Sequence, residues 1–214
     1  MGDVLPTLPV LITYTLAVIA LTLTPGPDMT LFLGKTVSQS RLAGFAAYAG
    51  AATGLLVHTV FVAIGLSALL VASATAFTVL KVVGALYLLW LAVDALRNGS
   101  SFQLDGTKLA AQSVKAVYLK GLLINLLNPK IIVFFITFLP QFVSPTDPNA
   151  SAKLIVLGVL FVVIATPITT TMIVFAGSLA RFLKRSPKAT RAVDWLFATV
   201  LGGFAVKLLL TRAS

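Results

Sequence analysis

The chain has 214 residues, of which 58% are hydrophobic and 10% are charged, and its net charge is +10. Soluble domains carry roughly 25% charged residues, so this composition excludes a small water-soluble domain. The absence of cysteine excludes disulfides, thiol nucleophiles and thiolate metal sites. The composition therefore indicates an integral membrane protein.

Long stretches without charge support this interpretation. No charged residue occurs in residues 4–27, 42–80 or 154–180. A membrane-spanning helix needs about 20 mostly apolar residues, and each stretch reaches that length. The hydropathy pattern predicts an all-α polytopic membrane protein with six transmembrane helices and short connections, forming a single domain over residues 1–214. The predicted helices span residues 9–33, 44–71, 77–96, 116–142, 154–179 and 192–210.

The basic residues are distributed unevenly between the two sides of the membrane. The loops after the first, third and fifth helices hold ten lysines and arginines, and the opposite side holds four. By the positive-inside rule these odd-numbered loops are cytoplasmic and both termini lie outside. The excess of positive charge is thus explained by topology and contact with membrane lipids, and no nucleic-acid partner is expected. The ten loop residues are Lys35, Arg41, Arg97, Lys108, Lys115, Arg181, Lys184, Arg185, Lys188 and Arg191.

Two proline breaks occupy matching places in the two halves of the chain. Residues 25–27 read Pro-Gly-Pro within the first helix, and Asn128-Pro129 interrupts the fourth. Each half holds three predicted spans, so the second half enters the membrane in the opposite direction. The pattern therefore predicts two inverted three-helix repeats, about residues 1–97 and 115–214, with broken helices one and four.

The breaks are candidate parts of a transport site. Pro25 and Pro27 each remove a backbone donor, Gly26 adds flexibility, and Pro129 acts in the same way in the fourth helix. Backbone groups freed inside a membrane must be satisfied by protein, water or substrate, so the breaks are expected to face a cavity. The open ends of half-helices suit the carboxylate and ammonium of a zwitterion. A proline kink that serves only packing is the alternative.

Polar side chains adjoin both breaks. Asp28 could bind a substrate ammonium or exchange a proton, or it could simply cap the helix that follows. Lys130 could pair with Asp28 or face a substrate carboxylate, or it could extend toward the cytoplasmic surface. Asn125 lies one turn before Asn128, and both are candidate substrate ligands.

His58 lies midway along the second predicted helix, and its ordinary pKa range suits a proton relay. The alternative is a neutral histidine bonded to a backbone carbonyl, to Tyr48 or to Thr59. One histidine cannot form a metal site without further ligands, so no metal and no cofactor are expected.

Two further motifs concern helix packing and the pathway. Gly50 and Gly54 form a G-x-x-x-G pattern, which permits close helix contact within one chain, between two copies of a homo-oligomer, or along a substrate-lining face. Thr166 and Pro167 are predicted to break the fifth helix. The hydroxyls of this region could line the pathway; they belong to Thr166, Thr169, Thr170 and Thr171.

Four segments together resemble the LysE/RhtB family of amino-acid exporters. They are residues 24–28 (Thr-Pro-Gly-Pro-Asp), 50–58, 84–88, and 121–130, which ends in Asn-Leu-Leu-Asn-Pro-Lys. The resemblance covers essentially the whole chain. It implies export of an amino acid or a derivative across the bacterial inner membrane, driven by the proton gradient.

The resemblance has one departure. Exporters of basic amino acids in this family carry an aspartate in the second span, near the position of Gly54, and this chain has no carboxylate there. A neutral amino acid is therefore expected as substrate rather than a basic one. Asp28 and His58 remain as candidates for the proton carrier.

The leading hypothesis is a proton-coupled secondary exporter that works by alternating access and binds substrate between the broken helices. An ion or metal exporter on the same scaffold and a passive channel are the alternatives. An enzyme is not expected, because the chain has few groups that could serve as nucleophile, base and partner. The identity of the amino acid and the oligomeric state remain open.

Overall fold

The computed structural model describes residues 6–72, 74–98, 111–143, 147–178 and 186–210, and within these ranges the chain is helical and contains no strand. The all-α prediction is confirmed for this part of the chain. Arg181, Lys184, Arg185 and Lys108, used above to assign the topology, lie outside the described residues. The helices are α1 (Leu8–Leu23), α2 (Pro27–Ser38), α3 (Arg41–Ala72), α4 (Ala74–Asn98), α5 (Val114–Leu126), α6 (Pro129–Val133), η1 (Phe134–Phe138), η2 (Leu139–Phe142), α7 (Ala150–Val174) and α9 (Pro187–Leu210).

Several of these helices are long and apolar enough to cross a membrane. Among the described residues, Arg41–Gly65 and Ala150–Val174 qualify as single straight spans. Two bent pairs qualify when each pair counts as one span: α1 with α2, bent by 53°, and α5 with Pro129–Phe142, bent by 50°. The chain is thus a polytopic membrane protein with up to four spans by this criterion. The arrangement with six spans stays a prediction.

The helix breaks occur where prolines were predicted to cause them in two cases, but not in the third. α1 stops before residues 25–27, and α5 stops before Pro129. The predicted break at Thr166 and Pro167 is wrong, because α7 runs through Pro167 without interruption. Threonine hydroxyls in this part of α7 donate to carbonyls one turn earlier, from Thr166 to Val162 and from Thr171 to Pro167. α7 therefore accommodates a lone proline without ending.

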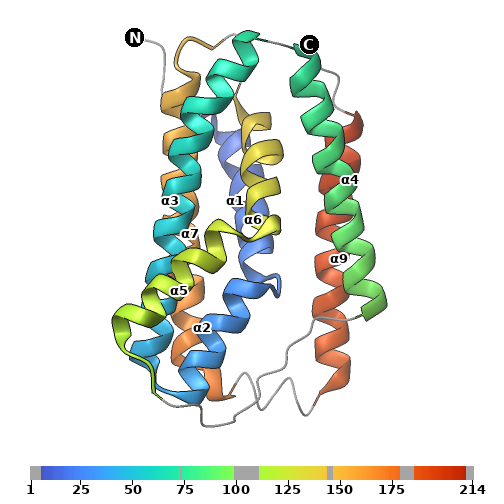
Figure 1. Cartoon of the computed structure of the whole chain (residues 1–214). Coiled ribbons are helices and arrows are strands. Elements are labelled where there is room, and N and C mark those ends of the chain that lie inside the picture. Colours follow the sequence, from blue (N-terminus) through green and yellow to red (C-terminus); the bar gives the residue numbers. More distant parts are fainter. Residues whose placement is uncertain (1–5, 73, 99–110, 144–146, 179–185, 211–214) are drawn as a thin grey trace.

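When each bent pair is counted as one unit, successive units run in alternating directions along the bundle, and the two breaks lie near its middle (Figure 1). α1 and α6 occupy the upper half of the view, whereas α2 and α5 occupy the lower half. α4 and α9 pack against each other at one side of the bundle. This layout places the ends of four half-helices at one level in the interior.

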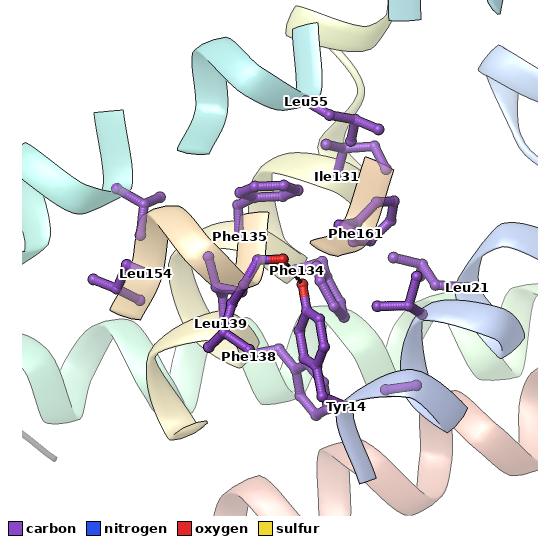
Figure 2. Packing of buried hydrophobic residues seen from close by; sticks show 14 of the residues in the cluster. Tyr14, Leu21, Leu55, Ile131, Phe134, Phe135, Phe138, Leu139, Leu154 and Phe161 are labelled. Atoms are coloured by element: carbon purple, nitrogen blue, oxygen red, sulfur yellow. Dashed lines mark hydrogen bonds between the residues drawn. The ribbon is translucent and has the colours of Figure 1, made fainter. Parts of the chain in front are cut away.

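An aromatic core fills the space between α1, α7 and the segment after the second break (Figure 2). The rings of Phe134 and Phe138 lie 4.9 Å apart, and Phe134 meets Phe161 of α7 edge-on at 5.5 Å. The fully buried Tyr14 donates its hydroxyl hydrogen to the Leu157 carbonyl at 2.7 Å. This hydrogen bond joins α1 to α7 and satisfies the one polar atom that the ring would otherwise bury unpaired.

The glycine pattern on α3 serves contact with α5 inside the chain. A Cβ atom at Gly50 would lie 2.0 Å from the Tyr118 carbonyl oxygen, and one at Gly121 would lie 2.1 Å from the Ala47 carbonyl oxygen. Backbone therefore touches backbone across this pair of helices. Of the interpretations left open by the sequence, packing within one chain accounts for Gly50.

We expect Gly50→Ala to lower the free energy of unfolding by about 1–3 kcal/mol, because the added methyl group meets backbone atoms that cannot move alone. Thermal unfolding in detergent measures the effect as a fall in Tm. Gly65→Ala is the matched control on the same helix, since no atom of another helix in the described part of the chain lies within 4 Å of its Cβ position. Equal Tm values for the two variants would contradict the α3–α5 contact.

A small polar cluster precedes α7. The Asp147 carboxylate forms an ion pair with Lys153 and accepts a hydrogen bond from the Asn149 amide at 2.8 Å. The hydrogen bond from Lys153, followed by that from the Asn149 amide, holds the pKa of Asp147 below its ordinary value. The charged form of Asp147 is thereby favoured in the folded protein.

Because the folded-state pKa of Asp147 is lowered, its stabilising effect is complete above the unfolded-state pKa of about 3.9 and is lost as the pH falls through the folded-state pKa. We expect Asp147→Asn to lower Tm slightly at neutral pH and to leave it unchanged at the lowest pH. NMR titration of the carboxyl carbon tests the cause, since Lys153→Met should return the pKa toward its ordinary value. A wild-type pKa at or above that value would contradict the pairing.

Candidate functional site

Each break is built from a proline that starts the second half-helix. Pro27 is the first residue of α2 after the N-cap residue Gly26, and Pro129 is the first residue of α6 after Asn128. A proline is tolerated at this position because its missing amide hydrogen would have no partner there. The Asn128 side chain caps α6 by accepting a hydrogen bond from the Lys130 amide at 3.0 Å. The local sequence thus ends one half-helix and begins the next at both breaks.

The carboxylate of the first break is held by two asparagines of the second. Asp28 Oδ2 accepts hydrogen bonds from Asn125 Nδ2 at 3.0 Å and from Asn128 Nδ2 at 2.8 Å. The alternative that Asp28 caps the helix that follows is wrong, because no side chain caps α2. Asp28 still lies in the first turn of α2, where the helix dipole favours a negative charge.

The lysine of the second break caps the first half-helix. Lys130 Nζ donates to the Thr24 carbonyl at 3.2 Å and to the Leu21 carbonyl at 3.4 Å, and the side chain is 9% exposed. Lys130 therefore does not extend to the membrane surface. Gly26 leaves room for this ammonium, because a Cβ atom there would lie 3.0 Å from Nζ. The carbonyl end of α1, expected to be open for substrate, is occupied by a cation of the protein.

Asn125 connects the remaining polar residues of the site. Its carbonyl accepts a hydrogen bond from His58 Nε2 at 3.3 Å, which is one of the alternatives that the sequence left for this histidine. A Cβ atom at Gly54 would lie 2.5 Å from Asn125 Oδ1. Asn125 is 1% exposed. It contacts Asp28, His58 and Gly54 at the same time. The second glycine of the G-x-x-x-G pattern makes room for this asparagine.

A pocket lies between the two breaks, and the empty space at this place, open solvent included, is ≈ 460 Å³. Asp28, Asn125 and Lys130 reach it from the breaks. The lining residues are Leu21, Thr22, Thr24, Asp28, Met29, Phe32, Tyr48, Ala51, Leu55, Asn125, Lys130, Ile131, Phe161, Ala165 and Thr169.

Of the α7 residues predicted to line the pathway, Thr169 lines the pocket and Thr166 and Pro167 do not. Ala165 and Thr169 line it, whereas Thr166 lies outside the lining and is linked to the pocket residue Tyr48 by a hydroxyl contact of 2.8 Å. Pro167 is exposed. Sequence reasoning missed Thr22, which lies in the last turn of α1 before the break. Its place one turn from the prolines was the available signal.

No three His, Asp or Glu side chains of the described ranges gather closely enough to hold a metal ion. The described residues therefore contain no cluster of metal ligands that would support the alternative of a metal-ion exporter. Asp28 is held instead by the side-chain amides of Asn125 and Asn128.

Comparison with known proteins identifies the family. Residues 19–212 match the family described as LysE type translocator. The chain therefore belongs to the LysE translocator family, whose members are transporters and not enzymes. No solved structure matches the chain significantly.

Relatives resemble the chain along nearly its whole length. A protein of Vibrio cholerae described as an uncharacterized membrane protein is 33% identical over 94% of this chain and 96% of its own. A homoserine/homoserine lactone efflux protein of Salmonella typhimurium is 32% identical, over 87% of this chain and 89% of its own. A leucine efflux protein of an Enterobacter species is 27% identical, over 92% and 93% respectively.

Proposed function

We propose that the protein is a secondary active exporter of a neutral amino acid or amino-acid derivative across the bacterial inner membrane. The observation that carries this proposal is the meeting of both helix breaks at one pocket, with the Asp28 carboxylate held by Asn125 and Asn128. A negative charge in the membrane interior is costly, and where such a charge lies between broken helices it marks a candidate transport site. Membership of a translocator family supports the same function.

A neutral cargo is supported from two sides. Relatives are named for efflux of homoserine, homoserine lactone and leucine, none of which has a charged side chain. Within this chain, Gly54 lies against Asn125 where a second-span carboxylate would otherwise add negative charge beside Asp28. Lys130 already donates to the carbonyls of Leu21 and Thr24, so these carbonyls are not open to a cationic side chain of a basic substrate.

The proposed mechanism is alternating access coupled to protons. Asp28 and His58 both contact Asn125, so a change in the protonation of either group can alter the bonds that hold the two breaks together. The site then consists of residues from both breaks and their neighbours on α3 and α7: Pro25, Gly26, Pro27, Asp28, Gly54, His58, Asn125, Asn128, Pro129, Lys130, Thr166 and Pro167.

The proposed organisation is a single domain of six spans, formed by inverted repeats over about residues 1–97 and 115–214. Both termini lie outside and the odd-numbered loops are cytoplasmic, as the distribution of lysine and arginine indicates. The two bent pairs, α1 with α2 and α5 with Pro129–Phe142, are the corresponding first spans of the repeats.

Flux from proteoliposomes tests the proposal. Liposomes with purified protein are loaded with a mixture of amino acids, and efflux is followed by mass spectrometry with and without an imposed pH gradient. We expect selective efflux of neutral amino acids that depends on the gradient. Efflux that ignores the gradient would instead support a channel, and no efflux of any amino acid beyond that of protein-free liposomes would refute the cargo class.

A further inference from the structure

The pocket contains buried oxygen atoms that have no partner within the described part of the chain. They are Thr22 Oγ1, Asp28 Oδ1 and Asn125 Oδ1. All three residues line the same pocket. Carboxylate and amide oxygens accept hydrogen bonds, and a hydroxyl oxygen can also accept them. A buried acceptor left unpaired is costly, so such a group inside a pocket indicates the place of a ligand donor.

Thr22 differs from eight other threonines of the described helices. Eight threonines donate their hydroxyl hydrogens to the carbonyl four residues earlier, as Thr24 does to Ala20. In a helix this bond is the usual way to satisfy the hydroxyl. The buried Thr22 hydroxyl makes no such bond, and Thr22 is one of the residues that line the pocket.

The charges of the pocket are matched to a ligand cation rather than a ligand anion. Lys130 is the basic residue of the lining, and its ammonium is enclosed by the Leu21 and Thr24 carbonyls and by Gly26. Asp28 uses only Oδ2 in bonds to the asparagines, so Oδ1 keeps its acceptor capacity. The remaining wall is largely apolar, with Phe32 and Phe161 among its members.

We infer that Thr22 Oγ1 and Asp28 Oδ1 form a subsite for a primary ammonium group. Asn125 Oδ1 faces Gly54 and is not assigned to this subsite. The inference rests on the proposed export function and makes it more specific. The cargo is a compact primary amine with an uncharged body, and its carboxylate need not be free. Amides, esters and lactones of neutral amino acids are then bound as well as the amino acids themselves.

Ligand-induced stabilisation of the purified protein tests this inference. One panel contains L-leucine, L-leucine amide and N-acetyl-L-leucine, and the other contains L-homoserine, its lactone and N-acetyl-L-homoserine. The apparent Kd of each compound is obtained from the dependence of Tm on its concentration. We expect the parent and carboxyl-blocked compounds of at least one panel to have Kd values within about threefold of each other. The N-acetyl compounds are expected to bind at least tenfold more weakly.

Variants of Thr22 assign the subsite to this residue. Thr22→Val keeps the shape of the side chain and removes the acceptor, so the Kd of the amine compounds should rise about tenfold. Thr22→Ser keeps the hydroxyl and should restore binding. Thr13→Val is the control on the same helix, because Thr13 bonds the Pro9 carbonyl and does not line the pocket. The Tm of each variant without ligand shows whether it is folded.

Different failures have different meanings. If the parent amino acids bind but their carboxyl-blocked forms do not, the site recognises the whole zwitterion and the inference is wrong while the export function stands. Equal binding of the N-acetyl compounds, or a Thr22→Val variant that binds like the wild type, would also overturn it. If no compound of either panel binds, the proposed cargo class fails together with the inference.

Discussion

Replacing Asp28 by asparagine is expected to reduce gradient-driven export by roughly 10- to 100-fold, the loss expected when a hydrogen-bonded charge at a ligand site is removed. An asparagine at this position can still accept hydrogen bonds from Asn125 and Asn128 through its carbonyl oxygen, so the arrangement of the two breaks should persist. What disappears is the negative charge and the ability to exchange a proton. Efflux from proteoliposomes under an imposed pH gradient measures the effect.

The matched control is Asp147→Asn, which makes the same chemical change in the polar cluster before α7. This variant should export at close to the wild-type rate. If Asp28→Asn exports as fast as Asp147→Asn and keeps its dependence on the gradient, Asp28 is neither a substrate ligand nor a proton carrier. His58 would then be the remaining titratable candidate, and His58→Gln would be the next variant.

Replacing Lys130 by methionine is expected to lower the free energy of unfolding by about 3–5 kcal/mol, the usual cost of removing one member of a buried charged arrangement. Methionine fills much of the same space but donates no hydrogen bond. The carbonyls of Leu21 and Thr24 lose their hydrogen-bond donor. The Asp28 carboxylate loses the positively charged ammonium of Lys130, which lines the same pocket. Denaturant unfolding in mixed micelles measures the change.

A double variant separates these two contributions. Asp28→Asn combined with Lys130→Met removes both charges, so the double variant should lose less stability than the sum of the two single variants. The difference between that sum and the loss of stability in the double variant measures the electrostatic coupling across the breaks. Simple additivity would contradict that coupling and would leave Lys130 with only its role at the end of α1.

The positions of the two breaks could be predicted from the sequence because proline acts locally. Pro27 and Pro129 start new helices wherever the rest of the chain lies, since each lacks an amide hydrogen and clashes with the preceding turn. The same rule was wrong for Pro167, because α7 continues through this exposed proline. A single proline is therefore not sufficient to end a helix.

The partners of the polar residues could not be predicted from local rules. Asp28 and Asn128 are separated by 100 positions, and nothing in the short range of either residue selects the other over water, lipid or substrate. The sequence left several possible partners for Lys130. Its hydrogen bond to the Thr24 carbonyl forms because the tertiary structure places the first break beside it. The free hydroxyl of Thr22 was likewise visible only once the helix around it was known.

Composition, charge-free stretches and the two proline motifs by themselves determined that this chain is a helical membrane protein with two broken helices. These features are read over one helix or one turn, where backbone geometry and hydropathy act without help from distant residues. Only the tertiary structure decided that Lys130 caps the opposite half-helix, that Asn125 joins Asp28 to His58, and that one pocket lies between the breaks. Such contacts depend on how distant helices cross, because a buried polar group takes the partner that packing brings within reach.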